Sequence, residues 1–173
     1  MTAVPLVRMS VGVVVERRKA TSLWIDVTWR PTAVLVGQPD APPWTELARE
    51  GEAALFYAGQ ADIEFYRSEA ANYRDNLASG APLLWITLRQ RAGEPPCEIA
   101  GVTADPAEGE CWTEPGDAVV EAVAMPDPIR AAVAAFVAEH YVEAPFSKRQ
   151  RDRANPEALA RHAPGHRSDD ERS

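Results

Sequence analysis

Alternating apolar and polar positions near the start of the chain predict two β-strands. From Met9 to Val15 every second residue lies on one fully apolar face, and a period of two indicates a strand. The alternation continues through 23–36, where Pro31 cannot donate a ladder hydrogen bond, so we expect a bend or bulge there. Trp24 and Arg30 share the more polar face of this second strand, which predicts a partly exposed tryptophan.

The middle of the chain predicts a hairpin, a short helix and a central strand. Two strand patterns, 53–58 and 62–66, flank Gly59-Gln60-Ala61, which suits a short hairpin loop. Residues 69–77 place apolar side chains at helical spacing. The nearly continuous apolar run 83–89 indicates a strand that is covered on both faces.

The second half of the chain predicts two further strands and the clearest helix. Strand patterns cover 98–103 and 118–124. Between them, 104–117 contains two prolines, two glycines and five acidic residues, the composition of an exposed loop or hairpin tip. Asp127 is a suitable N-cap with Pro128 at the first helical position, and apolar residues follow at helical spacing.

These elements predict an α+β fold in a single globular domain over residues 1–144. We expect a mostly antiparallel sheet of about six to seven strands, a short middle helix, and a C-terminal amphipathic helix packed on the sheet. Residues 145–173 are polar and cannot bury enough surface to offset their ordering entropy. They are therefore expected to form a flexible, disordered tail.

The charge balance differs between these two parts of the chain. Residues 1–144 contain 11 Lys and Arg against 21 Asp and Glu, whereas 145–173 contain 7 against 5. The tail begins with a compact basic run, defined by Lys148, Arg149, Arg151 and Arg153. Such a run on an acidic molecule favours contact with an acidic protein surface, or with the chain's own acidic segment 105–117. The net charge of −8 disfavours general nucleic-acid binding.

No motif in the sequence indicates catalysis. No Gly-rich loop is present that could bring backbone N–H groups close to a phosphate. Cys97 and Cys111 have no second metal-binding residue at close spacing, so we interpret them as core or strand thiols. The acids of 105–117 match no calcium-loop pattern, and a solvated hairpin tip is favoured over a metal site. We expect a non-catalytic protein without a metal or cofactor.

The N-terminal segment lacks the order of a signal peptide, because its short apolar run at 11–15 is followed by basic residues instead of being preceded by them. Two cysteines without a disulfide framework suit a reducing compartment. The sequence therefore predicts a cytoplasmic protein that does not enter a membrane.

Several short stretches of the sequence resemble one known family. They are VGVVVERR at 11–18, Trp24 followed by Trp29-Arg30-Pro31, YRDNL at 73–77, PLLWITLR at 82–89, VTADP at 102–106 and FSKRQRDR at 146–153. Together they resemble an uncharacterised proteobacterial domain-of-unknown-function family. Its members are often labelled molybdopterin-guanine dinucleotide biosynthesis protein A and are associated with accessory genes of formate dehydrogenase.

The resemblance implies a non-catalytic accessory protein that assists assembly or maturation of a molybdenum-dependent formate dehydrogenase. The contacts with this protein partner would come from the basic run together with Trp24 and Arg30. The guanylyl transfer named in the family label is not favoured, because it needs a Gly-rich phosphate loop and Gly12 stands alone in the corresponding segment.

Two alternatives remain open. The first is a molybdenum-cofactor enzyme or carrier that binds molybdopterin or its guanine dinucleotide, with Arg17, Arg18 and Arg89 as candidate phosphate contacts. The second is RNA binding through the basic run, which predicts an affinity that falls steeply with salt.

Overall fold

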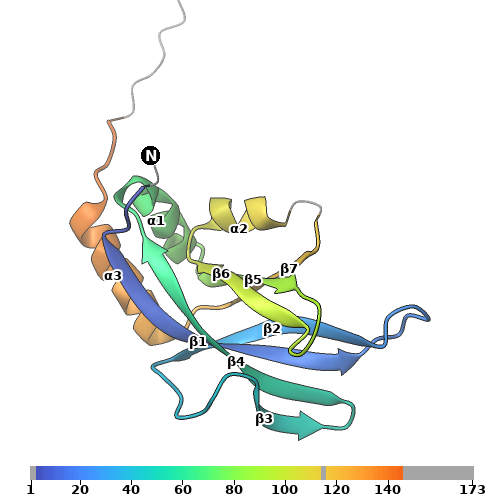
Figure 1. Ribbon diagram of the computed structural model, residues 1–173. Coiled ribbons are helices and arrows are strands. Elements are labelled where there is room, and N and C mark those ends of the chain that lie inside the picture. Colours follow the sequence, from blue (N-terminus) through green and yellow to red (C-terminus); the bar gives the residue numbers. More distant parts are fainter. Residues whose placement is uncertain (1–2, 114–115, 146–173) are drawn as a thin grey trace, which may run out of the picture. The chain divides into compact units, whose positions relative to one another are not determined.

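The computed structural model describes residues 3–113 and 116–145 (Figure 1). The chain divides into a compact unit, Met1–Val142, and a second unit, Glu143–Ser173. The basic run Lys148, Arg149, Arg151 and Arg153 lies outside the described residues, as does nearly all of the predicted tail. The expected contact between this run and the acidic segment therefore stays a prediction.

Seven strands of the first unit form one sheet in the order β2-β1-β4-β6-β5-β7, with β3 also paired to β4. All the pairs are antiparallel except β4 with β6. The predicted α+β class and mostly antiparallel sheet are therefore confirmed. The strands are β1 Val7–Lys19, β2 Val27–Val36, β3 Thr45–Glu50, β4 Ala53–Phe65, β5 Leu83–Gln90, β6 Cys97–Thr103 and β7 Ala118–Ala124.

The sheet curls until it nearly closes into a barrel, which the sequence pattern did not predict. β2 and β7 stand at the two ends of the strand order and still contact each other, although no ladder joins them within the described residues. The interior is filled by fully buried branched side chains from β1, β4 and β5, namely Val11, Val13, Val15, Ile63, Leu84, Ile86 and Leu88. Burial of these apolar surfaces is the main favourable term in forming the curled sheet.

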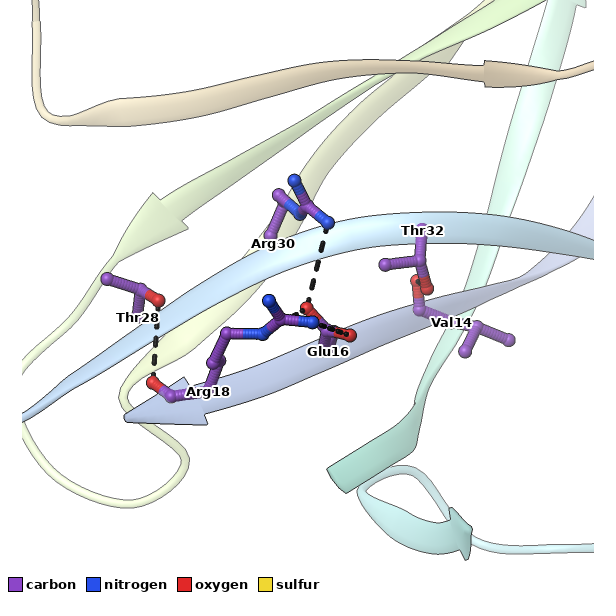
Figure 2. Close-up of polar contacts among 6 residues, drawn as sticks. All are labelled: Val14, Glu16, Arg18, Thr28, Arg30 and Thr32. Carbon is purple, nitrogen blue, oxygen red and sulfur yellow. Dashed lines mark hydrogen bonds and ion pairs between the residues drawn. The ribbon is translucent and has the colours of Figure 1, made fainter. Parts of the chain in front are cut away.

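Two bulges lie opposite the same short stretch of β1. On one side, Val14 pairs with Ala33 and Val15 with Pro31, so Thr32 is the extra residue. The hydroxyl of Thr32 donates a 3.5 Å hydrogen bond to the carbonyl oxygen of Val14, as Figure 2 shows. The bulge expected at Pro31 is therefore confirmed. Bulges of this kind bend a strand and increase its twist, which helps the sheet to curl.

The hairpin predicted around Gly59 is wrong. β4 runs unbroken from Ala53 to Phe65, and its register against β1 shifts where Val13 pairs with Gly59 and Val14 with Tyr57. The 13 residues of β1 offer a continuous partner, so the chain passes through Gly59 instead of turning back. With φ at +129°, Gly59 adopts a conformation that other residues rarely reach, and the second bulge forms here.

The exposed loop predicted over 104–117 is also wrong in its centre. Residues Pro106–Trp112 form helix α2, and the carboxylate of Asp105 caps it by accepting a 2.8 Å hydrogen bond from the backbone N–H of Ala107. Asp105 is 4% exposed, so its carboxylate caps the helix and does not belong to a solvated hairpin tip. Pro at the first helical turn and Asp before it are a helix start signal that outweighed the loop-like composition.

The start of the second strand and one further strand also differ from the expectation. β2 begins at Val27, so residues 23–26 lie in the loop between β1 and β2 instead of in a strand. β3 was not predicted; its residues Thr45–Glu50 are mostly polar and exposed, and pairing with β4 makes them a strand. An edge strand of this kind carries little apolar periodicity for a pattern to detect.

Helices close one end of the barrel (Figure 1). Helix α3, Asp127–His140, buries Ile129, Val133 and Phe136, and the Phe136 ring centroid lies 5.4 Å from that of Phe65 in β4. The predicted C-terminal helix and its packing on the sheet are confirmed, but Asp127 is its first residue instead of the N-cap, which is Pro126 and makes no side-chain cap hydrogen bond. Helix α1, Ala70–Ala78, follows a short 3-10 turn at Arg67–Glu69 and packs beside α3.

Asn76 of α1 joins this helix to two strands. Its side-chain amide donates to the carbonyl oxygens of Leu83 and Ala104 at 2.8 and 2.9 Å, and its Oδ1 accepts from the N–H of Leu83 at 3.0 Å. Leu83 begins β5, and Ala104 follows the end of β6. Because the Asn76 side chain is buried, these hydrogen bonds satisfy its polar groups within the protein.

Replacement of Gly109 tests how α2 packs on the sheet. A Cβ at this position would lie within 3.0 Å of the Trp85 indole, so we expect Gly109→Ala to lower the free energy of unfolding by about 1–3 kcal/mol through overpacking. Helix propensity alone would favour alanine by up to about 1 kcal/mol, which makes the sign of the change decisive. Urea denaturation measures the change, with the exposed Glu110→Ala as the control. A more stable Gly109→Ala variant would contradict this packing.

Candidate functional site

The barrel end opposite the helices carries a large cavity. Its volume is about 810 Å³, within the range typical of ligand sites. The lining comes from the end of β1, the start of β2, the β3–β4 region, the β5–β6 loop and the start of β7. The residues are Arg17, Ile25, Val27, Thr28, Trp29, Trp44, Phe56, Gln90, Glu94, Pro95, Pro96 and Val119. We call this space the barrel-mouth cavity.

Three aromatic rings form one wall of the barrel-mouth cavity. The Trp29 centroid lies 5.6 Å from that of Trp44 in an edge-to-face arrangement and 5.5 Å from that of Phe56. Trp44 has a φ of +70°, a region that bulky residues rarely occupy, and its backbone N–H donates to the carbonyl oxygen of Tyr57. Such strained residues concentrate at binding sites. Among the described residues, Trp29 Nε1 is the buried side-chain polar atom that lacks a hydrogen-bond partner.

Arg17 is the cation of this cavity. It is half-buried and pairs across the strands with Trp29 on one side and with Ala54 on the other. The structure gives it no ion pair with Glu94 or with any other described carboxylate within 4.0 Å. Glu46 is close enough for Arg17 to help lower its pKa, but the main cause is its hydrogen bond with Arg49. The guanidinium of Arg17 is therefore free to meet an anion.

The other candidate cations of the sequence are engaged elsewhere. Figure 2 shows that Glu16 pairs with both Arg18, at 3.2 Å, and Arg30, at 3.7 Å. Arg89 lies 3.6 Å from Glu98 on the neighbouring strand. Neither Arg18 nor Arg89 lines the barrel-mouth cavity, so the structure does not bring the three expected phosphate contacts together.

The β1–β2 loop exposes three consecutive large apolar side chains. Leu23 is 97% exposed, Trp24 93% and Ile25 54%. We call residues 23–25 the apolar loop. Ile25 also lines the barrel-mouth cavity, so the apolar loop borders the cavity. The sequence predicted a partly exposed Trp24 in a strand. Trp24 is instead almost fully exposed, because residues 23–26 form a loop, and it shares no strand face with Arg30.

Trp44, Phe56 and Gln90 are cavity residues that the sequence reading did not single out. They lie in three different segments, and no local spacing connects them. The nearest signal was the strand pattern over 53–58, which includes Phe56 but does not show which strand stands beside it. The sequence could place each aromatic in an element, but the register between elements brings them together.

A second, smaller cavity of about 390 Å³ lies between the 3-10 turn and α2. Its lining includes Tyr66, Glu69, Asp105, Glu108 and Cys111. A hydrogen bond with Glu64, followed by burial, raises the pKa of the Tyr66 hydroxyl. No three potential metal donors converge in the part of the chain that the structure describes. This cavity is therefore acidic and small, and it lacks the aromatic wall of the other.

The two cysteines should differ in reactivity. Cys97 is buried, and burial raises the pKa of its thiol to about 11, whereas Cys111 is exposed. Because the thiolate is the nucleophile, we expect one thiol to react rapidly with Ellman's reagent at pH 8 and the other only after unfolding. Cys111→Ser should abolish the rapid phase, and Cys97→Ser should keep it. A rapid phase that survives Cys111→Ser would contradict this assignment.

Trp24 should dominate the quenching of the intrinsic fluorescence. It is the only one of the five tryptophans that is classed as exposed, and all five lie within the described residues. We expect Trp24→Phe to remove most of the fraction that acrylamide quenches easily, whereas Trp29→Phe should leave this fraction in place. Equal Stern–Volmer constants for the wild type and Trp24→Phe would show that the loop does not expose its tryptophan.

None of the helices that the structure describes has both the length and the apolar character needed to cross a membrane. The expected cytoplasmic location stays a prediction.

No curated protein and no solved structure matches this chain. One family, described as a protein of unknown function (DUF3305), matches residues 10–150, a range that includes the whole lining of the barrel-mouth cavity. That description names neither formate dehydrogenase nor a molybdenum cofactor. The chain belongs to the DUF3305 family of proteins of unknown function.

Proposed function

We propose that this protein is a non-catalytic accessory protein that binds a partner protein at the open end of its barrel. The observation that carries the proposal is the apolar loop beside the barrel-mouth cavity. Leu23 and Trp24 are almost fully exposed, and contiguous apolar surface of this kind marks interaction sites in proteins. Tryptophan is also among the residues that contribute most to protein interfaces.

The shape and the charge of this surface favour a protein partner over a lipid surface. A loop that inserts into a membrane protrudes alone and relies on surrounding cations, whereas the apolar loop continues into a concave cavity through Ile25. Lys19, at the base of the loop, is paired with Glu52 at 3.4 Å, and the chain has a net charge of −8. An anionic bilayer would repel such a molecule, whereas an apolar partner surface would fit the loop without this repulsion.

The proposed partner is a molybdenum-dependent formate dehydrogenase, whose assembly or maturation the protein would assist. This choice rests on the sequence resemblance. The basic run at 148–153 supports an acidic partner surface, since its four cations lie within six consecutive residues.

A second candidate function is that of a molybdenum-cofactor carrier. The observation in its favour is Arg17, a cation without an ion pair among the described residues, next to the aromatic wall of Trp29 and Trp44. Such a wall suits a flat ring system, and a guanidinium suits a phosphate. If the purified protein binds neither molybdopterin guanine dinucleotide nor GTP at millimolar concentration, this candidate is excluded.

Partner binding can be measured with purified formate dehydrogenase subunits from the same organism. We expect Trp24→Ala to weaken capture more than tenfold, because an interface tryptophan at a hot spot contributes about 2 kcal/mol or more. Leu47→Ala, in the exposed part of β3, is the matched control and should bind as the wild type does. Alanine at Lys148, Arg149, Arg151 and Arg153 should weaken capture mainly at low salt, because salt screens exposed charges.

Two results would contradict the proposal. One is equal capture by the wild type and Trp24→Ala. The other is binding to vesicles of phosphatidylcholine and phosphatidylserine that Trp24→Ala abolishes, with no capture of the dehydrogenase subunits, which would assign the apolar loop to a membrane instead.

A further inference from the structure

The chemistry of the barrel-mouth cavity indicates which part of a partner it could hold. Arg17 and Trp29 are direct cross-strand partners, and both line the cavity. Opposed side chains of an antiparallel pair stand about 4.5–5.5 Å apart at their Cβ atoms, so the two side chains lie next to each other. Both are hydrogen-bond donors, and neither Trp29 Nε1 nor the Arg17 guanidinium has an acceptor among the described side chains. Because Trp29 Nε1 is buried, the donor that the cavity offers to a ligand is the Arg17 guanidinium, whose charge favours a negative acceptor.

A carboxylate matches these donors better than a neutral acceptor. Two parallel N–H donors of a guanidinium fit the two oxygens of one carboxylate, and such charge-assisted bonds are about twice as strong as neutral ones. Arg17 is half-buried beside aromatic rings, where the effective dielectric constant is lower than in water and the attraction is larger. Glu94 of the β5–β6 loop also lines the cavity but is exposed, so water screens its repulsion. The screened charge of Glu94 permits a ligand with one carboxylate but disfavours a ligand with several negative charges.

The remaining surface of the cavity requires an apolar group. Trp29, Trp44 and Phe56 form a packed wall, which an aliphatic or aromatic side chain would cover. Through Ile25 this wall continues outward to Leu23 and Trp24, which stand beyond the cavity. A small acid would fill the cavity and leave the apolar loop exposed. A peptide chain is long enough to cover both.

We propose that the barrel-mouth cavity binds a peptide segment that places one carboxylate on Arg17 and a neighbouring apolar side chain against Trp29, Trp44 and Phe56. This inference rests on the proposed function, because it names the part of the partner that the open end of the barrel holds. Arg17 selects for the acidic residue, and the aromatic wall and the apolar loop supply most of the contact area.

The test uses a phage-displayed library of random peptides, selected on the full-length protein. We expect enriched sequences to contain Asp or Glu next to a large apolar residue. In titrations, Arg17→Gln should bind the best peptide at least tenfold more weakly than the wild type does. Replacement of the peptide's acid by its amide should cause a similar loss in the wild type and almost none in Arg17→Gln, which identifies the pair directly. Arg17→Lys should bind with intermediate affinity, because lysine keeps the charge but loses the bidentate geometry.

Arg18→Gln is the matched control. Arg18 is the cation next to Arg17 in the sequence, but it pairs with Glu16 and lies outside the cavity. This variant should bind the peptide as tightly as the wild type does, and thermal unfolding should confirm that each variant is folded. The inference is overturned if no peptide is enriched, if enriched peptides lack an acid, or if Arg17→Gln and Arg18→Gln bind equally. Binding of free 3-phenylpropionate as tight as that of the peptide would overturn the peptide class.

The two proposals fail in distinguishable ways. If Trp24→Ala loses the dehydrogenase subunits while no acidic peptide is enriched, partner binding stands and the peptide inference falls. If acidic peptides depend on Arg17 but Trp24→Ala captures the subunits normally, the cavity chemistry stands and the assignment of the apolar loop falls.

Discussion

The continuous pairing of β1 on both of its edges is the constraint on which the rest of the structure depends. This strand pairs with β2 on one side and with β4 on the other, and its residues 11–15 are buried. Both bulges stand opposite Val13–Val15 of β1, with Thr32 and Ala58 as the extra residues. The two bulges lie in β2 and β4, opposite the same residues of β1, and bulges bend a strand and increase its twist. They therefore help to bring β2 toward β7 and nearly close the barrel.

Near closure makes the two ends of the barrel different. At one end, α1 and α3 cover the core through Tyr73 and Phe136, and Asn76 fixes α1 to the beginning of β5. At the other end, β1 and β2 lead into an exposed loop, and Arg17 of β1 and Val27, Thr28 and Trp29 of β2 line the cavity. The covered end holds the strands in place, so the residues at the open end are presented by a rigid scaffold.

The pattern of the sequence was most informative where one face of an element is buried locally. The helix beginning at Asp127, the strand 118–124 and the bend at Pro31 follow from periodicity and proline chemistry, and the structure contains all three. It failed where a distant partner decides the outcome. Gly59 suits a turn, yet β1 continues alongside it and makes it a bulge. Similarly, 104–117 has the composition of a loop, but packing of Gly109 on Trp85 and the cap at Asp105 stabilise a helix.

The same division holds for the candidate site. By itself the sequence named Arg17 and Arg18 as candidate contacts, but both lie beyond the strand that it predicted over 9–15. It also singled out Trp24 as a contact residue. Only the tertiary structure decided that β1 continues through both residues, and that Arg17 lines the cavity with Trp29, Trp44 and Phe56 whereas Arg18 lies outside it. The physical reason is that this choice depends on how distant strands pair and curl, and no local spacing encodes that register.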